Sequence, residues 1–216
     1  MDRRFRLAFV LPAAAAVVMV WTPVAMAQVA QPELPTLPDV VPVAVDPSTT
    51  AFLVLDITST ICTVRPACVA SVPAIARLLA KARAAGTFVG YSVGGTGILP
   101  EVASRANEPV VMSRADKFFN TNLDQLLSDN GIQTVVIVGS AANGAVLYTS
   151  FGAAERGYTV VAAVDGISSG PDFDTFLAEY QLLNMPGLSN PTNDPLKAQA
   201  ATLSRSDLIT FGSVSK

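Results

Sequence analysis

The segment Ala51-Phe-Leu-Val-Leu-Asp56 is an apolar run that ends on a carboxylate. A continuous apolar run of this length is typical of a strand covered on both faces, as in a parallel sheet. A second such run, Thr134 to Val138, is followed by small residues and then by a helical pattern. Strands and helices alternate along the rest of the chain, which indicates right-handed crossovers. The sequence therefore predicts a three-layer α/β/α domain with a mostly parallel sheet of about six strands.

The remaining elements are expected from hydrophobic periodicity and from cap and turn residues. Ser71 is expected to cap a helix that Gly86 ends, and Thr121 is expected to open a helix that stops at Gly131. The other expected strands are 87–92, 108–112, 158–165 and 207–211, and the other expected helices are 144–156, 172–183 and 195–203.

The N-terminal region has the composition of a leader and a linker. Residues 1–27 combine a basic start, an apolar run and the small-residue site Ala25-Met-Ala27, which is typical of a secretory signal peptide. The apolar run is shorter than the roughly 20 residues that span a bilayer. Residues 28–49 hold five prolines and are predicted to be an extended tether, either a spacer or a segment that wraps over the domain. Residues 50–216 form the predicted domain, and the mature protein is expected to be periplasmic or secreted, with no membrane segment.

Composition excludes several classes of function. The chain has 216 residues, a formal net charge of -3 and a pI of about 4.9, which argues against binding to nucleic acid. It has no histidine, so Ser-His-Asp and Cys-His sites are excluded, as are zinc sites that need histidine. We therefore expect no metal and no cofactor, and any proton transfer must use Asp, Glu, Lys, Tyr or Cys.

The two cysteines, Cys62 and Cys68, lie six residues apart. In an exported protein a local disulfide is the plain interpretation. Two alternatives remain open at this point. One cysteine could be a free nucleophile with Arg65 stabilising its thiolate, or both could be reduced and unpaired.

Three features are expected at the carboxyl edge of the sheet, where open parallel sheets bind ligands. Asp56 ends the first strand, Lys117 follows the strand at 108–112, and the turn Gly139-Ser-Ala-Ala-Asn-Gly-Ala145 follows the strand at 134–138. Each feature also has a simpler interpretation: Asp56 could cap a loop, Lys117 could be a solvated surface lysine, and the turn could bind nothing.

The order and spacing of these residues resemble the isochorismatase-like hydrolases, also called the cysteine hydrolase superfamily, which have a Rossmann-like fold. That family pairs an Asp and a Lys with a Cys at the start of the helix after the turn. The resemblance implies that Asp56 and Lys117 are catalytic, whereas Ala145 stands at the position of the nucleophilic Cys. It also implies a cis peptide in the turn and an oxyanion hole of backbone N–H groups near Ala141, Ala142, Gly144 and Ala145. Thr58 stands where the family often has Gln, and Thr58, Phe118, Asn143 and Tyr148 are the candidate pocket residues.

The resemblance implies an exported hydrolase that acts on a small organic substrate through an Asp–Lys acid/base pair, without a cysteine nucleophile. The family branch that cleaves a vinyl ether does not need the cysteine, whereas the amidase branch does. The alternative is a catalytically degenerate member that binds a small molecule or a partner. The family commonly self-associates, so a homo-oligomer is also implied.

Overall fold

Six parallel strands form the main sheet in residues 33–212, the part of the chain that this computed structural model describes. In chain order the strands are β2 (Thr50–Leu55), β3 (Phe88–Ser92), β4 (Val110–Val111), β5 (Thr134–Ser140), β6 (Thr159–Ser168) and β7 (Ala201–Ser204). Their spatial order is β4-β3-β2-β5-β6-β7, and every neighbouring pair is parallel. The chain therefore reverses its direction of winding between β2 and β5, which is where a doubly wound sheet opens a crevice.

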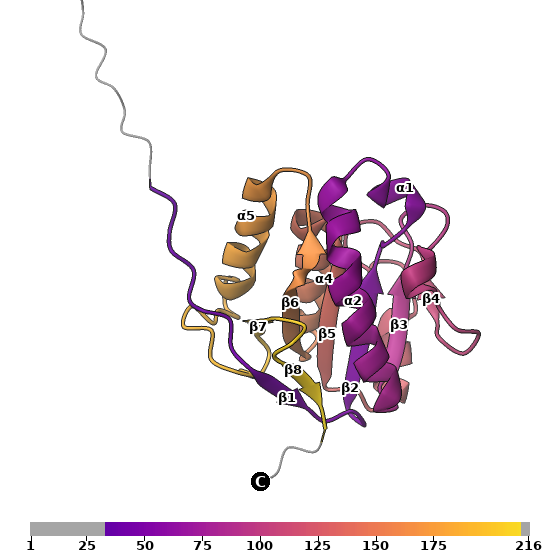
Figure 1. Ribbon diagram of the computed structural model, residues 1–216. Coiled ribbons are helices and arrows are strands. Elements are labelled where there is room, and N and C mark those ends of the chain that lie inside the picture. Colours follow the sequence, from indigo (N-terminus) through magenta and orange to yellow (C-terminus); the bar gives the residue numbers. More distant parts are fainter. Residues whose placement is uncertain (1–32, 213–216) are drawn as a thin grey trace, which may run out of the picture. The chain divides into compact units, whose positions relative to one another are not determined.

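Helices cover both faces of this sheet (Figure 1). The helices are α1 (Ser59–Cys62), α2 (Pro66–Ala84), α3 (Leu123–Asp129), α4 (Leu147–Glu155) and α5 (Asp172–Leu183), with short turns η1 (Pro100–Val102) and η2 (Ala142–Val146). Side chains of β2 alternate between the two cores: Leu53 and Leu55 pack with α3, α4 and α5, whereas Phe52 and Val54 pack with α2. This alternation explains the unbroken apolar run, because both faces of the strand are buried. The three-layer α/β/α prediction is confirmed.

The predicted tether is partly built into the domain. The chain divides into two units, Met1–Pro35 and Thr36–Lys216, and all the helices and strands named above belong to the second. Within that unit β1 (Val43–Val45) pairs in parallel with β8 (Ile209–Phe211) to form a separate two-stranded sheet. Val43 and Val45 are buried against the α2 side of the core. Residues 36–49 therefore wrap over the domain. The predicted signal peptide, residues 1–27, lies outside the described residues.

The C-terminal region differs most from the sequence prediction. The predicted helix 195–203 is wrong: residues 195–200 form turns, and β7 begins at Ala201. Asn193 holds this segment, because its side-chain Oδ1 accepts the Leu203 N–H and its Nδ2 donates to the carbonyls of Leu203 and Asp39. The predicted last strand is present as β8, but it pairs with β1 and not with the main sheet.

Two helix starts also differ from prediction. Helix α2 begins at Pro66 and not after Ser71. Proline suits the first turn of a helix because the N–H groups of that turn have no partner within the helix, so the N–H that proline lacks is not needed. Ser71 is inside the helix, and its hydroxyl donates to the Cys68 carbonyl. Helix α3 begins at Leu123, two residues after Thr121, whose hydroxyl accepts the Leu123 N–H and donates to the Lys117 carbonyl.

Gly139 is the tightest point of the sheet. Its φ is 152°, and a Cβ built there would collide with the Leu55 carbonyl oxygen on the adjacent strand. Only glycine fits where two backbones approach this closely.

We therefore expect Gly139→Ala to lower the free energy of unfolding by about 1–3 kcal/mol, as overpacking of a core does. Gly170→Ala is the matched control, because a Cβ there meets nothing within 4 Å and the backbone has no positive φ. Urea unfolding followed by circular dichroism measures both. Equal stabilities for the two variants would contradict the close approach.

Candidate active site

Asp56 lies at the point where β2 ends between β3 and β5. Its neighbours across the sheet are set by the pairing of Leu55 with Ser92 on one side and with Gly139 on the other. The Asp56 N–H still donates to the Ser92 carbonyl at 3.1 Å, but the backbone then turns to φ 56°. Aspartate is one of the few residues that tolerate this left-handed conformation. The turn ends the strand and leaves the carboxylate at the carboxyl edge of the sheet.

Lys117 meets this carboxylate from the loop between β4 and α3. Its Nζ lies 2.7 Å from Asp56 Oδ2, and the lysine and aspartate side chains are only 1% and 10% exposed. The same Nζ donates to the carbonyls of Arg114 at 2.6 Å and Ser113 at 3.4 Å. The ammonium group therefore has three acceptors for its three protons.

Ser92 completes the environment of the carboxylate. Its hydroxyl donates to Asp56 Oδ1 at 2.8 Å, and the residue is 1% exposed. Each oxygen of Asp56 thus accepts one short hydrogen bond, from Ser92 on one side and Lys117 on the other. Such an arrangement fixes the plane of the carboxylate and keeps the charged pair oriented.

Thr149 of α4 holds the lysine loop in place. Its fully buried hydroxyl accepts the Lys117 N–H at 3.1 Å and donates to the Ala115 carbonyl at 3.3 Å. On the other side of the lysine, the Thr121 hydroxyl donates to the Lys117 carbonyl at 2.6 Å. The backbone of Lys117 is therefore fixed independently of its ion pair.

The turn after β5 contains a cis peptide bond between Ser140 and Ala141 and continues into η2, where Ala145 lies. Asn143 is tied to the end of β6, because its N–H and its Oδ1 both bond the Ser169 hydroxyl. The Gly144 N–H donates to the Ala141 carbonyl. Ala142 is fully buried and Ala145 is 4% exposed, so this part of the turn carries only methyl side chains.

A glycine loop lies over Asp56. A Cβ at Gly94 would stand 2.8 Å from Asp56 Oδ2, so only a residue without a side chain fits there. The loop is held by α1: the Ser59 N–H donates to the Gly97 carbonyl at 2.7 Å, and the Thr96 N–H donates to the Thr60 hydroxyl. Helix α1 is in turn joined to α2 by a disulfide between Cys62 and Cys68.

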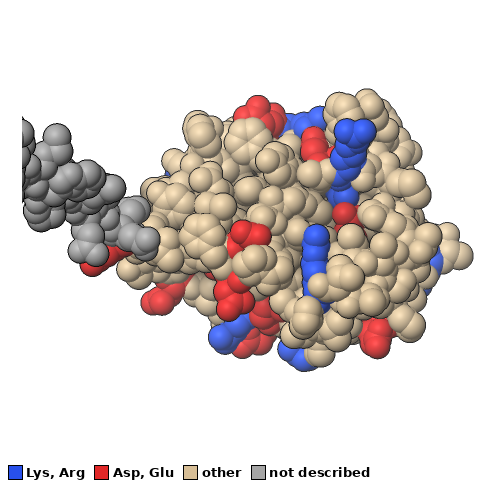
Figure 2. Space-filling model, turned by 90° about the horizontal axis from the view of Figure 1, so that it is seen from above, with Lys and Arg blue, Asp and Glu red and all other residues tan. Residues whose placement is uncertain are grey.

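An apolar groove of about 480 Å³ lies beside the turn, between α4 and α5. It is lined by Asn143, Leu147, Tyr148, Phe151, Leu177, Gln181, Met185 and Pro186. Figure 2 looks onto the carboxyl ends of the strands and shows a face on which charged side chains are few and scattered. The groove suits an apolar portion of a ligand, with the amides of Asn143 and Gln181 as its polar groups.

The structure brings together some of the candidate residues and separates others. Asp56 and Lys117 are in contact, and Asn143 and the half-exposed Tyr148 line the neighbouring groove. Thr58 is buried, and its hydroxyl caps α1 by accepting the Ile61 N–H, so it is not a pocket residue. Phe118 points into the core, where it stacks on Tyr158 and lies 4.5 Å from the Arg156 guanidinium.

The contacts that three residues make with the pair are not predicted from the sequence: those of Ser92, of Gly94 and of Thr149, which the sequence offers only as a hydroxyl near the turn. Ser92 ends a predicted strand, so the rule that places ligands at carboxyl ends could have found it. The approach of Gly94 and the hydrogen bond of Thr149 depend on tertiary packing and have no local signal. Within residues 33–212 no group of three or more His, Cys, Asp or Glu side chains is arranged to hold a metal ion. In the same range no helix is both long and apolar enough to cross a membrane.

The protein is thus a doubly wound α/β domain, and a buried Asp–Lys pair lies at the carboxyl edge of its sheet, where the direction of winding reverses. The isochorismatase domain model matches residues 50–184, so the chain belongs to the isochorismatase family, a family of hydrolases. No curated protein matches this chain significantly.

Several solved structures share the fold. An isochorismatase family protein from Desulfovibrio vulgaris is 20% identical with a TM-score of 0.64, covering 74% of this chain and 95% of its own. N-carbamoylsarcosine amidase from Thermoplasma acidophilum is 23% identical with a TM-score of 0.61, covering 74% and 97%. A nicotinamidase from Staphylococcus aureus is 20% identical with a TM-score of 0.63, covering 73% and 99%. At these identities the likeness establishes the fold alone.

Removing the lysine should leave a buried carboxylate without its counter-charge. We expect Lys117→Met to lower the free energy of unfolding by about 3–5 kcal/mol, which is the usual cost of breaking a buried pair. Asp56→Asn combined with Lys117→Met should recover part of that loss, since no charge is then stranded.

Lys197→Met is the matched control, because Lys197 is exposed and bonds only the Ser189 carbonyl. It should change stability by less than about 0.5 kcal/mol. Denaturant unfolding of the wild type, of the single variants Asp56→Asn and Lys117→Met and of the double variant gives the coupling energy. Strictly additive effects of the Asp56 and Lys117 changes would show that the two groups do not interact.

Proposed function

We propose that this chain is a hydrolase that cleaves a small organic substrate by proton transfer from the Asp56–Lys117 pair, with water as the nucleophile. The observation that carries the proposal is the buried 2.7 Å contact between the two side chains at the carboxyl edge of the sheet. A general acid or base needs this kind of position, oriented by hydrogen bonds and with one oxygen edge open to a substrate.

The hydroxyl groups nearest the turn support water as the nucleophile. The Ser140 hydroxyl donates to the Ser168 carbonyl, and that of Thr149 is committed to the lysine loop. Tyr148 is 55% exposed and lies on the outer groove. None of the three has a histidine to activate it, because the chain has none. With Ala145 at the cysteine position, a covalent acyl-enzyme has no attacking group there.

Hydrolysis of a vinyl ether fits these groups. A proton from the pair passes through Asp56 to the terminal carbon of the double bond, which leaves an oxocarbenium ion at the ether carbon. Water adds to that carbon and returns a proton to Asp56. The resulting hemiketal breaks its C–O bond to give a carbonyl compound and an alcohol. Because Asp56 is ionised in the ion pair, the transferred proton originates from the Lys117 ammonium, and the proton that water returns to Asp56 restores that ammonium.

A binding protein without turnover is the second candidate function, and two observations favour it. Position 145 carries a methyl group, and the Asp56 side chain is only 10% exposed beneath the glycine loop. In that case the apolar groove of Asn143 and Tyr148 would hold the ligand, and the ion pair would be structural.

Asp56→Asn separates the two functions. Asparagine also tolerates φ near 56°, so the backbone should be retained while the acid is lost. We expect turnover in a panel of vinyl ethers and amides to fall at least about a hundredfold. Asp172→Asn, an exposed change in the first turn of α5, should leave turnover unchanged.

Turnover that survives Asp56→Asn would overturn the mechanism. Absence of turnover by the wild type, together with equal thermal stabilisation of wild type and Asp56→Asn by a member of the panel, would establish the binding function instead.

We also propose that the chain is exported. The composition of residues 1–27 supports this, and so does the Cys62–Cys68 disulfide, since disulfides persist in oxidising compartments. Intact-mass measurement of the protein recovered from cells that express the full chain should give a mature form that begins at Gln28. A form that retains Met1 would contradict the proposal.

A further inference from the structure

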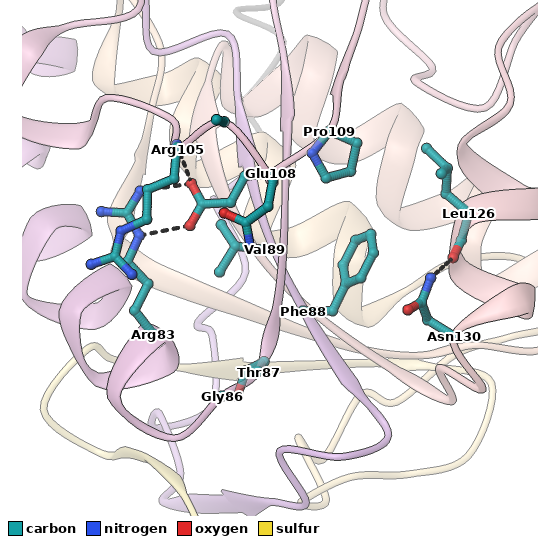
Figure 3. A pocket seen from close by; sticks show the side chains of 12 residues that line it. Arg83, Gly86, Thr87, Phe88, Val89, Arg105, Glu108, Pro109, Leu126 and Asn130 are labelled. Atoms are coloured by element: carbon teal, nitrogen blue, oxygen red, sulfur yellow. Dashed lines mark hydrogen bonds and ion pairs between the residues drawn. The ribbon is translucent and has the colours of Figure 1, made fainter.

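A second cavity, of about 670 Å³, lies at the opposite edge of the sheet from Asp56. It is bounded by the last turn of α2, the start of β3, the loop before β4 and the end of α3 (Figure 3). Phe88 opens β3 and Ser92 closes it, so the cavity and the candidate active site are roughly 13 Å apart along that strand. The volume is in the range of ordinary ligand pockets.

One side of this cavity is charged, and its single carboxylate is already neutralised. Arg83 donates from Nε to Glu108 Oε1 at 2.8 Å and from Nη2 to Oε2 at 2.7 Å. The Arg105 N–H also donates to Oε2 at 2.8 Å. Burial by itself would raise the pKa of Glu108, but these hydrogen bonds outweigh it and hold the pKa below its usual value. Glu108 therefore stays ionised and paired with Arg83.

The Arg105 guanidinium is the second positive charge at this cavity, in addition to that of Arg83. Among residues 33–212, Arg105 takes part in no ion pair, and its side chain is exposed at the cavity. The lining thus carries two arginines against one glutamate, a net charge of +1. This is a local excess of positive charge on a chain whose formal net charge is -3.

The other side of the cavity is apolar. Figure 3 shows Arg83, Arg105 and Glu108 together on one side, and Phe88, Pro109 and Leu126 on the other. Phe88 and Leu126 are only partly buried, although both pack against the main core. Their remaining surface faces the cavity, where an aromatic ring could stack on Phe88.

We propose that this cavity binds a small aromatic monocarboxylate, with its ring against Phe88 and Leu126 and its carboxylate on the Arg105 guanidinium. A monoanion matches the net charge of +1, and a planar apolar body matches the opposite wall. The site is separate from the Asp56–Lys117 pair and does not depend on the proposed hydrolysis.

The test is a titration of the ¹⁵N-labelled full chain with benzoate, followed by amide chemical shifts, with neutral benzamide as the matched ligand. We expect benzoate to shift the Gly86 and Val89 amides with a millimolar or lower Kd, and benzamide to bind at least about tenfold more weakly. Arg105→Gln should weaken the binding of benzoate about tenfold, because the guanidinium is lost. The variant should keep the hydrogen bond from the backbone N–H of residue 105 to Glu108, so the rest of the cavity is retained. Arg77→Gln, an exposed change on α2 outside the cavity lining, should not alter these shifts.

Three results would overturn the proposal. The first is an absence of shifts at Gly86 and Val89. The second is equal binding of benzoate and benzamide at those amides. The third is shifts confined to the carboxyl edge around Gly94 and Ala145, which would assign the carboxylate to the other site.

Discussion

The structure depends on keeping two opposite charges, those of Asp56 and Lys117, inside the domain. Removal of a carboxylate and an ammonium from water costs several kcal/mol per ion, and their attraction repays this only when every remaining donor and acceptor is used. That condition is met: Lys117 has three oxygen acceptors, and Asp56 has a donor on each oxygen. Apolar residues in place of such a pair are often neutral or stabilising. Stability alone therefore gives no reason to keep such a pair, which is consistent with the proposed role of the Asp56 carboxylate in proton transfer.

The pair also explains the residue types around it. The carboxylate of Asp56 lies between β3 and β5. Gly139 allows the backbones of β2 and β5 to approach there, and Gly94 allows the glycine loop to lie against the carboxylate. A lysine that must reach it from the far side of β3 requires a fixed loop, and Thr149 supplies that by bonding the Lys117 N–H. Thr149 lies one turn after Ala145 on the same helical segment. The lysine loop and the turn are therefore positioned by one element.

The sequence predicts those parts of the site whose position follows from strand ends. Asp56 and the turn after β5 each follow an apolar run, so their meeting at one edge is a consequence of parallel order. Lys117 is expected near this edge because it follows a predicted strand, and the family resemblance adds its catalytic role. Ser92 also ends a predicted strand, but its bond to Asp56 is not predicted, and the contacts of Gly94 and Thr149 arise from packing between distant segments. The same limit applies to the C-terminal region. The sequence pattern at 195–203 predicts a helix, but the side chain of Asn193 bonds the backbone of Leu203 instead. Strand β8 pairs with β1, which lies in the proline-rich segment that was predicted to be a tether.

Access to the carboxylate narrows the chemistry that this edge can perform. Under the proposed function, a substrate would contact the Asp56 carboxyl group, whose side chain is 10% exposed, and not Lys117, whose side chain is 1% exposed. Transfer of a proton to a carbon or oxygen atom needs only that contact. Covalent catalysis also needs an attacking group, and position 145, where the family resemblance would place one, carries a methyl group. The apolar groove beside Asn143 is a separate feature of the molecule, because neither Asp56 nor Lys117 lines it. The proposed acid-catalysed addition of water therefore needs fewer groups at this edge than acyl transfer does, and it needs none at position 145.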